Sequence, residues 1–243
     1  MRIARALALA GVDSRRKCEA HVAAGLVTVN GQVVTDLGRQ VDPSTDRITF
    51  RGRPLKVAPF VYYLLHKPKG YTTTAFDPHA EKTVYELLPK SLAARGARDR
   101  TQRVFPVGRL DRDSTGLLLF TNDGETANRL THPRYGAIKW YRVRLDRPLA
   151  DSDRLKLLRG IRLEEGMAEA REIEILPDAA VRVQMAEGKK REVRRLFAAL
   201  HYRVTDLCRT EFGPLKLDRI PLGKGRFLTA QEIHLLRRLC EGL

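Results

Sequence analysis

The sequence predicts an α+β protein in which a small helix-helix-hairpin domain precedes a larger domain with a mixed, mainly antiparallel sheet. Near the start of the chain, two short helical segments precede a hairpin centred on Asn30-Gly31. Further along, an unbroken apolar run at 117–121 is bounded by turn-forming residues and is typical of a buried strand. The later strands follow one another too closely for a simple alternating parallel sheet.

The first domain is expected to span residues 1–55. Apolar residues between Ile3 and Ala10 recur at helical spacing, and a second helix begins after the capping residue Ser14 and ends at Gly25. Strands on both sides of Asn30-Gly31 and another at 47–50 complete the domain. The composition of 51–54 is that of a linker, and we place the boundary at a linker over 56–60, so that the second domain spans 61–243.

The second domain is expected to contain alternating short strands and helices around the buried strand. Between its first elements and that strand, the Arg-rich stretch 93–103 is expected to be an exposed, mobile loop. The expected elements, in chain order, are a strand at 62–65, a loop at 67–71, a short helix ending before Pro89, the strand at 117–121, a helix at 125–130, a strand at 141–145, a helix at 152–158, strands at 173–175 and 181–185, an amphipathic helix at 191–201, a strand at 204–207, and a last helix opened by the Thr229–Glu232 capping box.

The composition indicates an anionic partner. The 243 residues carry a formal charge of +16, and the basic excess is concentrated before residue 61 and after residue 180. The chain contains no apolar run long enough to cross a membrane. Its three Cys are far apart and its six His are isolated, so neither a disulfide framework nor a metal site is expected. We therefore expect a cytoplasmic, monomeric protein without a metal.

A basic cluster in the first domain indicates nucleic-acid binding. Arg15, Arg16 and Lys17 lie in the first turn of the second helix, where positive charge opposes the helix dipole, so a phosphate contact explains them better than a structural role. Together with 25–31 and Val33, the stretch 14–19 resembles the S4-like RNA-binding domain. The resemblance covers nearly the whole unit and implies binding to structured RNA.

The polar turn before the buried strand carries the candidate for chemistry, Asp111. A rigid strand fixes such a turn at the edge of a sheet, which suits a reactive side chain. The motif Gly-Arg-Leu-Asp at 108–111, followed by 115–119, resembles the catalytic motif of pseudouridine synthases, in the ribosomal RNA branch that carries an S4-like domain. The stretches 139–143 and 187–196 resemble two further motifs of that family, with Trp140 and Glu192 as departures where a smaller residue and an amide are usual.

This resemblance implies a cofactor-free isomerisation of uridine to pseudouridine, with one essential carboxylate. Asp111 matches that carboxylate, which either attacks the ribose carbon or removes a ribose proton to give a glycal. Tyr141 matches the tyrosine that stacks on the target base, and Arg194 the basic residue that keeps the carboxylate ionised. Leu207 matches an apolar pocket residue, and Arg109 an arginine that enters the space left by the flipped base. Asp113 is expected only to stabilise the turn through a backbone amide.

The implied partner is ribosomal RNA or a ribosome assembly intermediate that contacts both domains. RNA of the large ribosomal subunit is slightly favoured as the substrate. The alternatives are a small-subunit or transfer RNA substrate, or a non-catalytic role as an RNA-binding assembly factor. Taken alone, Tyr141 and Leu207 would be core residues and Arg194 a surface arginine. The expected RNA contacts are Arg2, Arg5, Ser14, Arg15, Arg16, Lys17, Asn30, Lys67, Lys189, Lys190, Arg191 and Arg195.

Overall fold

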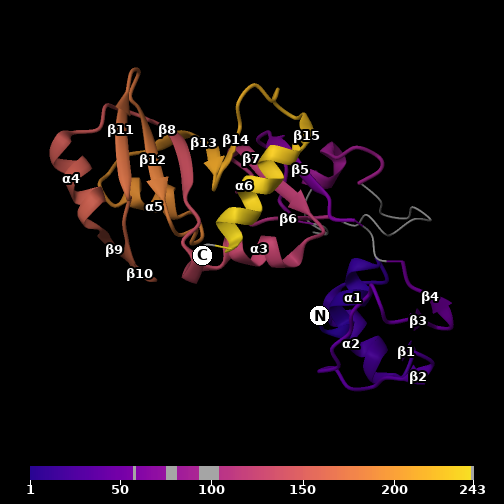
Figure 1. The fold of residues 1–243 in the computed structure, drawn as a ribbon. Helices are drawn as coiled ribbons and strands as arrows, with labels where there is room; N and C mark the ends of the chain where they lie inside the picture. The colour runs from indigo at the N-terminus through magenta and orange to yellow at the C-terminus, as the bar shows by residue number, and fades with distance from the viewer. Residues whose placement is uncertain (57–58, 75–80, 93–103, 242–243) are drawn as a thin grey trace. The chain divides into compact units, whose positions relative to one another are not determined.

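The computed structural model describes residues 1–56, 59–74, 81–92 and 104–241 (Figure 1). Its contacts divide the chain into two compact units, Met1–Val61 with Pro89–Val104, and Tyr62–Leu88 with Phe105–Leu243. The Arg-rich stretch 93–103 lies outside the described residues. None of the described helices combines the length and apolar character that a membrane crossing requires.

The first unit contains the expected two helices and hairpin. Its elements are α1 (Ile3–Leu9), α2 (Arg15–Ala23), β1 (Val27–Val29), β2 (Gln32–Val33), β3 (Ile48–Phe50) and β4 (Arg53–Pro54), with the strands in the order β2-β1-β3-β4. At the hairpin, Asn30 and Gly31 both have positive φ, as a two-residue turn of this kind needs. Buried residues of both helices and of β1 and β3 form the core.

One expectation for the first unit is wrong. The stretch 51–54 has the composition of a linker, yet Arg53–Pro54 pairs with β3 as strand β4. Arg51 and Gly52 both have positive φ, so the Gly-containing segment makes a tight turn between two strands instead of leaving the domain.

The second unit is built on one sheet in the order β11-β12-β8-β13-β7-β5-β15, with β14 beside β13 and β6 beside β7 (Figure 1). Its register is antiparallel except between β7 and β13, which run parallel, so the expected mixed, mainly antiparallel sheet is confirmed. The strands are β5 (Tyr62–Lys67), β6 (Phe105–Pro106), β7 (Thr115–Thr121), β8 (Lys139–Leu145), β11 (Glu172–Leu176), β12 (Ala180–Met185), β13 (Val204–Phe212), β14 (Leu215–Lys216) and β15 (Gly225–Phe227).

Helices cover this sheet and a second, two-stranded one lies beside it. The remaining elements are η1 (Val84–Leu87), α3 (Gly124–Thr131), η2 (Pro133–Tyr135), α4 (Asp151–Arg159), β9 (Ile161–Leu163), β10 (Gly166–Ala168), α5 (Glu192–Ala198) and α6 (Ala230–Glu241). On one face of the sheet, Leu117 and Leu119 of β7 pack in a common core with Leu130 of α3 and Leu236 of α6. The alternate face of β7 presents Phe120 to Tyr85 of η1.

The central strand ends as its sequence indicates. Asp123 caps α3 by accepting hydrogen bonds from the backbone amides of Glu125 and Thr126, and it also accepts one from the Tyr62 hydroxyl at 2.9 Å. Burial and the Asp123 carboxylate raise the pKa of Tyr62 to about 12. These bonds join the end of β7 to β5 and α3, which makes the strand a rigid support for the turn at its other end.

Candidate active site

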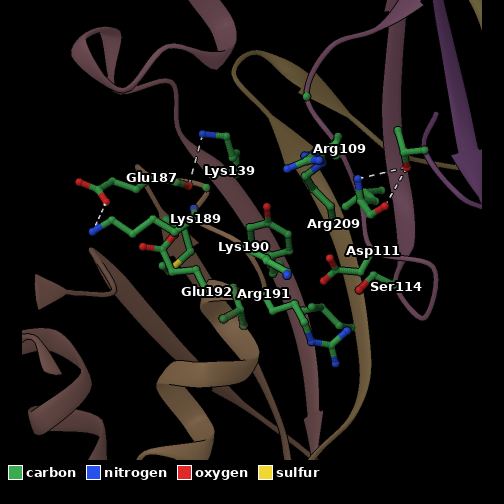
Figure 2. A pocket seen from close by; sticks show the side chains of 18 of the residues that line it. Arg109, Asp111, Ser114, Lys139, Glu187, Lys189, Lys190, Arg191, Glu192 and Arg209 are labelled. Carbon is green, nitrogen blue, oxygen red and sulfur yellow. Dashed lines mark hydrogen bonds and ion pairs between the residues drawn. The ribbon is translucent and has the colours of Figure 1, made fainter. Parts of the chain in front are cut away.

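The turn 108–114, called here the Asp111 turn, connects β6 to β7 and forms one side of a cleft of about 1140 Å³ in the second unit. Figure 2 shows Asp111 and Ser114 together on one side, with Lys139, Glu187 and Lys189 on the other. Because Phe212 of the α3–α6 core also lines the cleft, the cleft opens on that face of the sheet.

A fully buried lysine fixes the backbone of the Asp111 turn. Lys67, at the end of β5, donates hydrogen bonds from Nζ to the carbonyl oxygens of Ser114 at 2.8 Å, Asp111 at 2.9 Å and Pro68 at 3.1 Å. Burial lowers the pKa of Lys67 to about 8, although the charges of Asp111 and Asp113 act in the opposite direction. The side chain is 0% exposed, so the expected RNA contact of Lys67 does not fit its position, and its contacts are structural.

The other side of the turn is held by Thr73. Its hydroxyl donates to the carbonyl oxygen of Leu110 at 2.7 Å and lies 3.3 Å from the Leu110 amide nitrogen, which donates to it. The backbone on both sides of Asp111 is therefore bonded to buried groups, while the Asp111 side chain stays partly exposed in the cleft. This is the pre-organised placement that a reactive carboxylate needs.

A glycine sets the distance between the two strands that carry the site. Gly116, the second residue of β7, pairs with Arg209 of the parallel strand β13. A Cβ at Gly116 would lie 2.3 Å from the Arg209 carbonyl oxygen, and the residue has a φ of 115°. Only glycine permits this approach, which brings β13 to within reach of the Asp111 turn.

Tyr141 and Leu207 lie where the motifs predict, on the wall of the cleft. Tyr141 is the third residue of β8, is 9% exposed, and lies directly across from Arg209 of β13. Leu207 lies two residues before Arg209 on the same strand and is also buried. The apolar ring and side chain can therefore contact a planar group that enters the cleft.

The expected ion pair between Arg194 and Asp111 is wrong for this structure, in which Arg194 binds Asp113. Its guanidinium donates to the Val204 carbonyl oxygen at 3.0 Å and lies 3.2 Å from the Asp113 carboxylate. Arg191 makes two further bonds to the same carboxylate, each 3.2 Å long. Although burial would raise the pKa of Asp113, these arginines lower it. Asp113 thus joins the turn to α5 through ion pairs with these two arginines, a role that the expected backbone cap does not describe.

The remaining predicted RNA contacts fall into two groups. Arg109, Lys190 and Arg191 are exposed on the lining of the cleft. Lys189, partly exposed, also lines it and binds Glu187 and the Met167 carbonyl oxygen, while Arg195 pairs with Glu165 of the β9–β10 turn. The Lys189–Met167 and Arg195–Glu165 contacts attach the β9–β10 hairpin to α5 and to the segment just before it.

In the first unit, the predicted RNA contacts are exposed or partly exposed, but several have partners within the unit. Ser14 caps α2 by accepting from the Lys17 amide, and Arg15 and Lys17 pair with Glu19 and Asp13. The Asn30 amide bonds Asp46 and the backbone of Arg47. Arg16 and Arg2 are exposed, and Arg5 is partly exposed.

Two buried cations of the cleft escaped the sequence analysis. Arg209 and Lys139 both line it, at 2% and 7% exposure. Lys139 stands two residues before Tyr141, so the alternation of β8 could have placed it on the same face. Glu192, one of the two departures from the family motif, is also buried in the lining, and burial raises its pKa.

Comparison with known proteins gives a consistent result along the chain. The RNA pseudouridylate synthase family matches residues 61–199 and the S4 domain matches residues 1–48. The ribosomal large subunit pseudouridine synthase B of Bacillus subtilis is 38% identical over 246 residues, covering 99% of this chain and 97% of that one. The Vibrio cholerae protein of the same name is 35% identical, covering 99% and 75%. A crystal structure of a pseudouridylate synthase superposes with a TM-score of 0.68 at 30% identity, covering 97% of this chain and 99% of that one.

Proposed function

Because this chain belongs to the RNA pseudouridylate synthase family and carries an S4 domain at residues 1–48, we propose that it converts uridine in ribosomal RNA to pseudouridine. The observation that carries the proposal is Asp111, a partly exposed carboxylate on a turn fixed by Lys67 and Thr73, in a cleft that also holds Tyr141. The names of the Bacillus subtilis and Vibrio cholerae relatives favour RNA of the large ribosomal subunit.

The reaction needs the kind of site that these residues form. Pseudouridine formation breaks the bond between ribose C1′ and uracil N1 and joins C1′ to C5 of the same ring, so that no atom is gained or lost. In the proposal, the Asp111 carboxylate acts on the ribose, either by attack at C1′ or by removal of a ribose proton. The Tyr141 ring stacks on the base, and Leu207 packs against it.

Arg194 receives a revised role as a positioning residue. Its bonds to the Val204 carbonyl oxygen and to Asp113 tie α5, β13 and the Asp111 turn together. We propose that this connection fixes the position of Asp111 relative to β13, because the Asp111 turn could otherwise shift along that strand. Loss of Arg194 would then lower turnover while RNA binding persists.

Delivery of the RNA is assigned to the basic residues of both units. The target base has to leave its stack before Asp111 can reach the ribose, at a cost of a few kcal/mol. The exposed cations on the cleft, Arg109, Lys190 and Arg191, bind phosphates or occupy the vacated space, and Arg15, Arg16 and Lys17 bind the RNA through the S4 domain. A ribosomal RNA substrate would place the protein in the cytoplasm.

The proposal is tested by mapping pseudouridine in ribosomal RNA. Large-subunit and small-subunit RNA, naked and in assembly intermediates, are taken from cells that lack the gene and incubated with wild type or Asp111→Asn. We expect wild type to add pseudouridine at one site or very few in large-subunit RNA. The Asp111→Asn rate should fall by more than about 10³-fold, the scale on which loss of a reacting group is felt.

A matched substitution controls for the loss of one carboxylate. Asp178 is exposed in the turn between β11 and β12 and has a φ of 58°, which asparagine tolerates. Asp178→Asn should therefore behave as wild type. Identical pseudouridine maps for wild type and Asp111→Asn would refute the enzymatic function and favour a non-catalytic role in ribosome assembly, whereas a map confined to small-subunit RNA would correct the substrate alone.

A further inference from the structure

Arg209 is a buried cation with an unused donor on the wall of the cleft. The side chain is 2% exposed, and its Nε donates to the Leu117 carbonyl oxygen at 2.9 Å. Its Nη2 is buried and has no hydrogen-bond partner among the described residues. Buried polar groups are nearly always bonded, so a free one in a cleft indicates a bond that forms only when the cleft is occupied.

Strand pairing directs Arg209 into the cleft, and a β-bulge follows it. On β13, Arg209 lies opposite Tyr141 and Glu211 opposite Trp140, so that Thr210 is an extra residue without a counterpart on β8. Residues that lie directly across from each other share a face, so Arg209 lies beside Tyr141. In contrast, Glu211 faces the other way and binds Arg182 at 2.8 Å. In the view of Figure 2, Arg209 lies between Lys139 and Asp111.

No neighbouring polar group in the described lining accepts a hydrogen bond from the Arg209 Nη2. The Lys139 ammonium is bonded to the carbonyl oxygens of Ala137, Ala186 and Glu187, and its charge adds to that of Arg209. The other buried donor without a partner in the described lining is the Ser114 hydroxyl, which belongs to the Asp111 turn. Arg209 therefore offers a fixed, positively charged N–H in the cleft beside the ring of Tyr141.

We propose that Arg209 is a further catalytic residue, whose Nη2 donates a hydrogen bond to a carbonyl oxygen of the flipped uracil and stabilises the negative charge that forms there during the reaction. This inference rests on the proposed function. The placement matches the general device of a pre-organised donor aimed at developing charge in a site from which water is excluded. A hydrogen bond to a charged group is also stronger than one between neutral groups.

The charge follows from the bond changes of the isomerisation. When the C1′–N1 bond breaks, its electron pair stays on the uracil ring and is shared by N1, O2 and O4. After the ring turns, C5 bonds to C1′, C5 loses its proton and N1 gains one. As C5 bonds to C1′, the Asp111–C1′ bond of the first route breaks and frees the carboxylate. In the second route, Asp111 gives the ribose proton back. The uracil anion exists only between the two bonds, which is when Arg209 is needed.

The burial of Arg209 favours the base over a phosphate as its partner. Phosphates remain hydrated on the outer surface of folded RNA, where the exposed cations Arg109, Lys190 and Arg191 can meet them. Arg209 is reached only by a group that enters the cleft and contacts Tyr141. A flipped base is such a group, because it leaves the stack and enters a pocket.

The test compares Arg209→Met with Arg142→Met in single-turnover conversion and RNA affinity. Arg142 neighbours Tyr141 on β8 but is exposed, since alternation directs it to the opposite face, so it controls for loss of one arginine. We expect Arg209→Met to lower the single-turnover rate at saturating RNA by about 10²-fold with unchanged RNA affinity, and Arg142→Met to match wild type.

Replacing uracil oxygens by sulfur distinguishes contact with the base from a structural effect. RNA with 2-thiouridine or 4-thiouridine at the target gives the base a weaker acceptor at one position. One of the two should slow wild type and leave Arg209→Met no slower than on the normal base. Equal slowing of both proteins would overturn the inference. An Arg209→Met protein with normal rate at saturating RNA but lower affinity and a smaller salt slope would also overturn it, in favour of a phosphate contact.

Two further outcomes keep this test separate from that of the proposed function. If Arg209→Met does not fold, as judged by thermal unfolding, Arg209→Lys retains the charge, and the same comparison of thio-substituted RNAs is made with it. A lysine ammonium cannot reproduce the two directed bonds of the guanidinium, so a reduced rate is expected there too. Wild type that forms no pseudouridine would refute the function, whereas a fully active Arg209→Met would refute only this inference.

Discussion

Lys67 and Arg209 are both buried cations near Asp111, but their surroundings differ in one respect. Lys67 directs its ammonium to the carbonyl oxygens of three residues at 3.1 Å or less. Lys139, on the far side of the cleft, is bonded in the same way. Arg209 has one such bond through Nε, and its Nη2 has no partner in the described part of the chain. The number of protein acceptors, more than charge or burial, thus separates a structural cation from one available to substrate.

Gly116→Ala should have the largest effect on this comparison, since it disturbs the strand pair that places Arg209. The new Cβ would lie 2.3 Å from the Arg209 carbonyl oxygen and 2.4 Å from its nitrogen, so β7 and β13 would separate. We expect the free energy of unfolding to fall by about 4 kcal/mol, measured by denaturant titration.

Gly166→Ala is the matched control for Gly116→Ala. Gly166 has a φ of 111°, close to that of Gly116, but a Cβ there would meet nothing within 4 Å. Its loss of stability, about 1–2 kcal/mol, would report backbone strain alone. If the two variants were equally destabilised, crowding against Arg209 would not be the cause.

Lys67→Met should rank next, because it leaves the carbonyl oxygens of Asp111 and Ser114 buried without a donor. We expect a loss of about 3 kcal/mol in the free energy of unfolding and a reduced turnover in the molecules that remain folded. Lys69→Met is the control: Lys69 is half exposed and pairs with Asp206, and an exposed pair contributes at most about 1 kcal/mol. A Lys67→Met protein as stable and active as Lys69→Met would show that the carbonyl bonds do not hold the turn.

The last expected effect is a pH dependence of the free energy of unfolding that comes from the buried Lys139. Burial lowers the pKa of Lys139 to about 8, from 10.5, with a further contribution from the charge of Arg209. Between those values the unfolded chain binds more protons than the folded one, so wild type should gain stability relative to Lys139→Met as pH rises from about 8 to 10.5. Denaturant titrations across this range measure the difference, and a flat or falling difference would contradict the burial of a titrating lysine.

The fold could be predicted from the sequence where a local signal and the tertiary structure agree. The Asn30-Gly31 hairpin, the strand at 117–121 and the α6 helix after Thr229 all lie close to the expected residues. The β9–β10 hairpin and β15 were missed. Their strands have three residues each, as β1 does, but β1 is marked by the Asn30-Gly31 turn and they have no Asn-Gly turn beside them. Strand β13 extends to Phe212, although alternation stops at the extra residue Thr210.

The candidate site could be predicted in part, since motif resemblance locates side chains along the chain but not their partners. Asp111, Tyr141 and Leu207 all line the cleft as expected. The partner of Arg194 depends on how α5 meets the Asp111 turn, and in the structure that partner is Asp113. Arg209 lies two residues after Leu207 in continuous register, so the alternation of β13 could have placed it on the same face of the sheet, as it could for Lys139 beside Tyr141.

The extra residue of β13 also has a consequence for changes in chain length. It lets Arg209 and Phe212, which are three residues apart, face the same side of the sheet, with the guanidinium 4.9 Å from the ring centre. Deletion of Thr210 would restore simple alternation without exchanging either face. A second shift in the pairing of β13 leaves Thr205 without a counterpart between Val204 and Asp206. Because neither extra residue is needed for the pairing, this strand can lose either one and keep Arg209 and Phe212 on the same face.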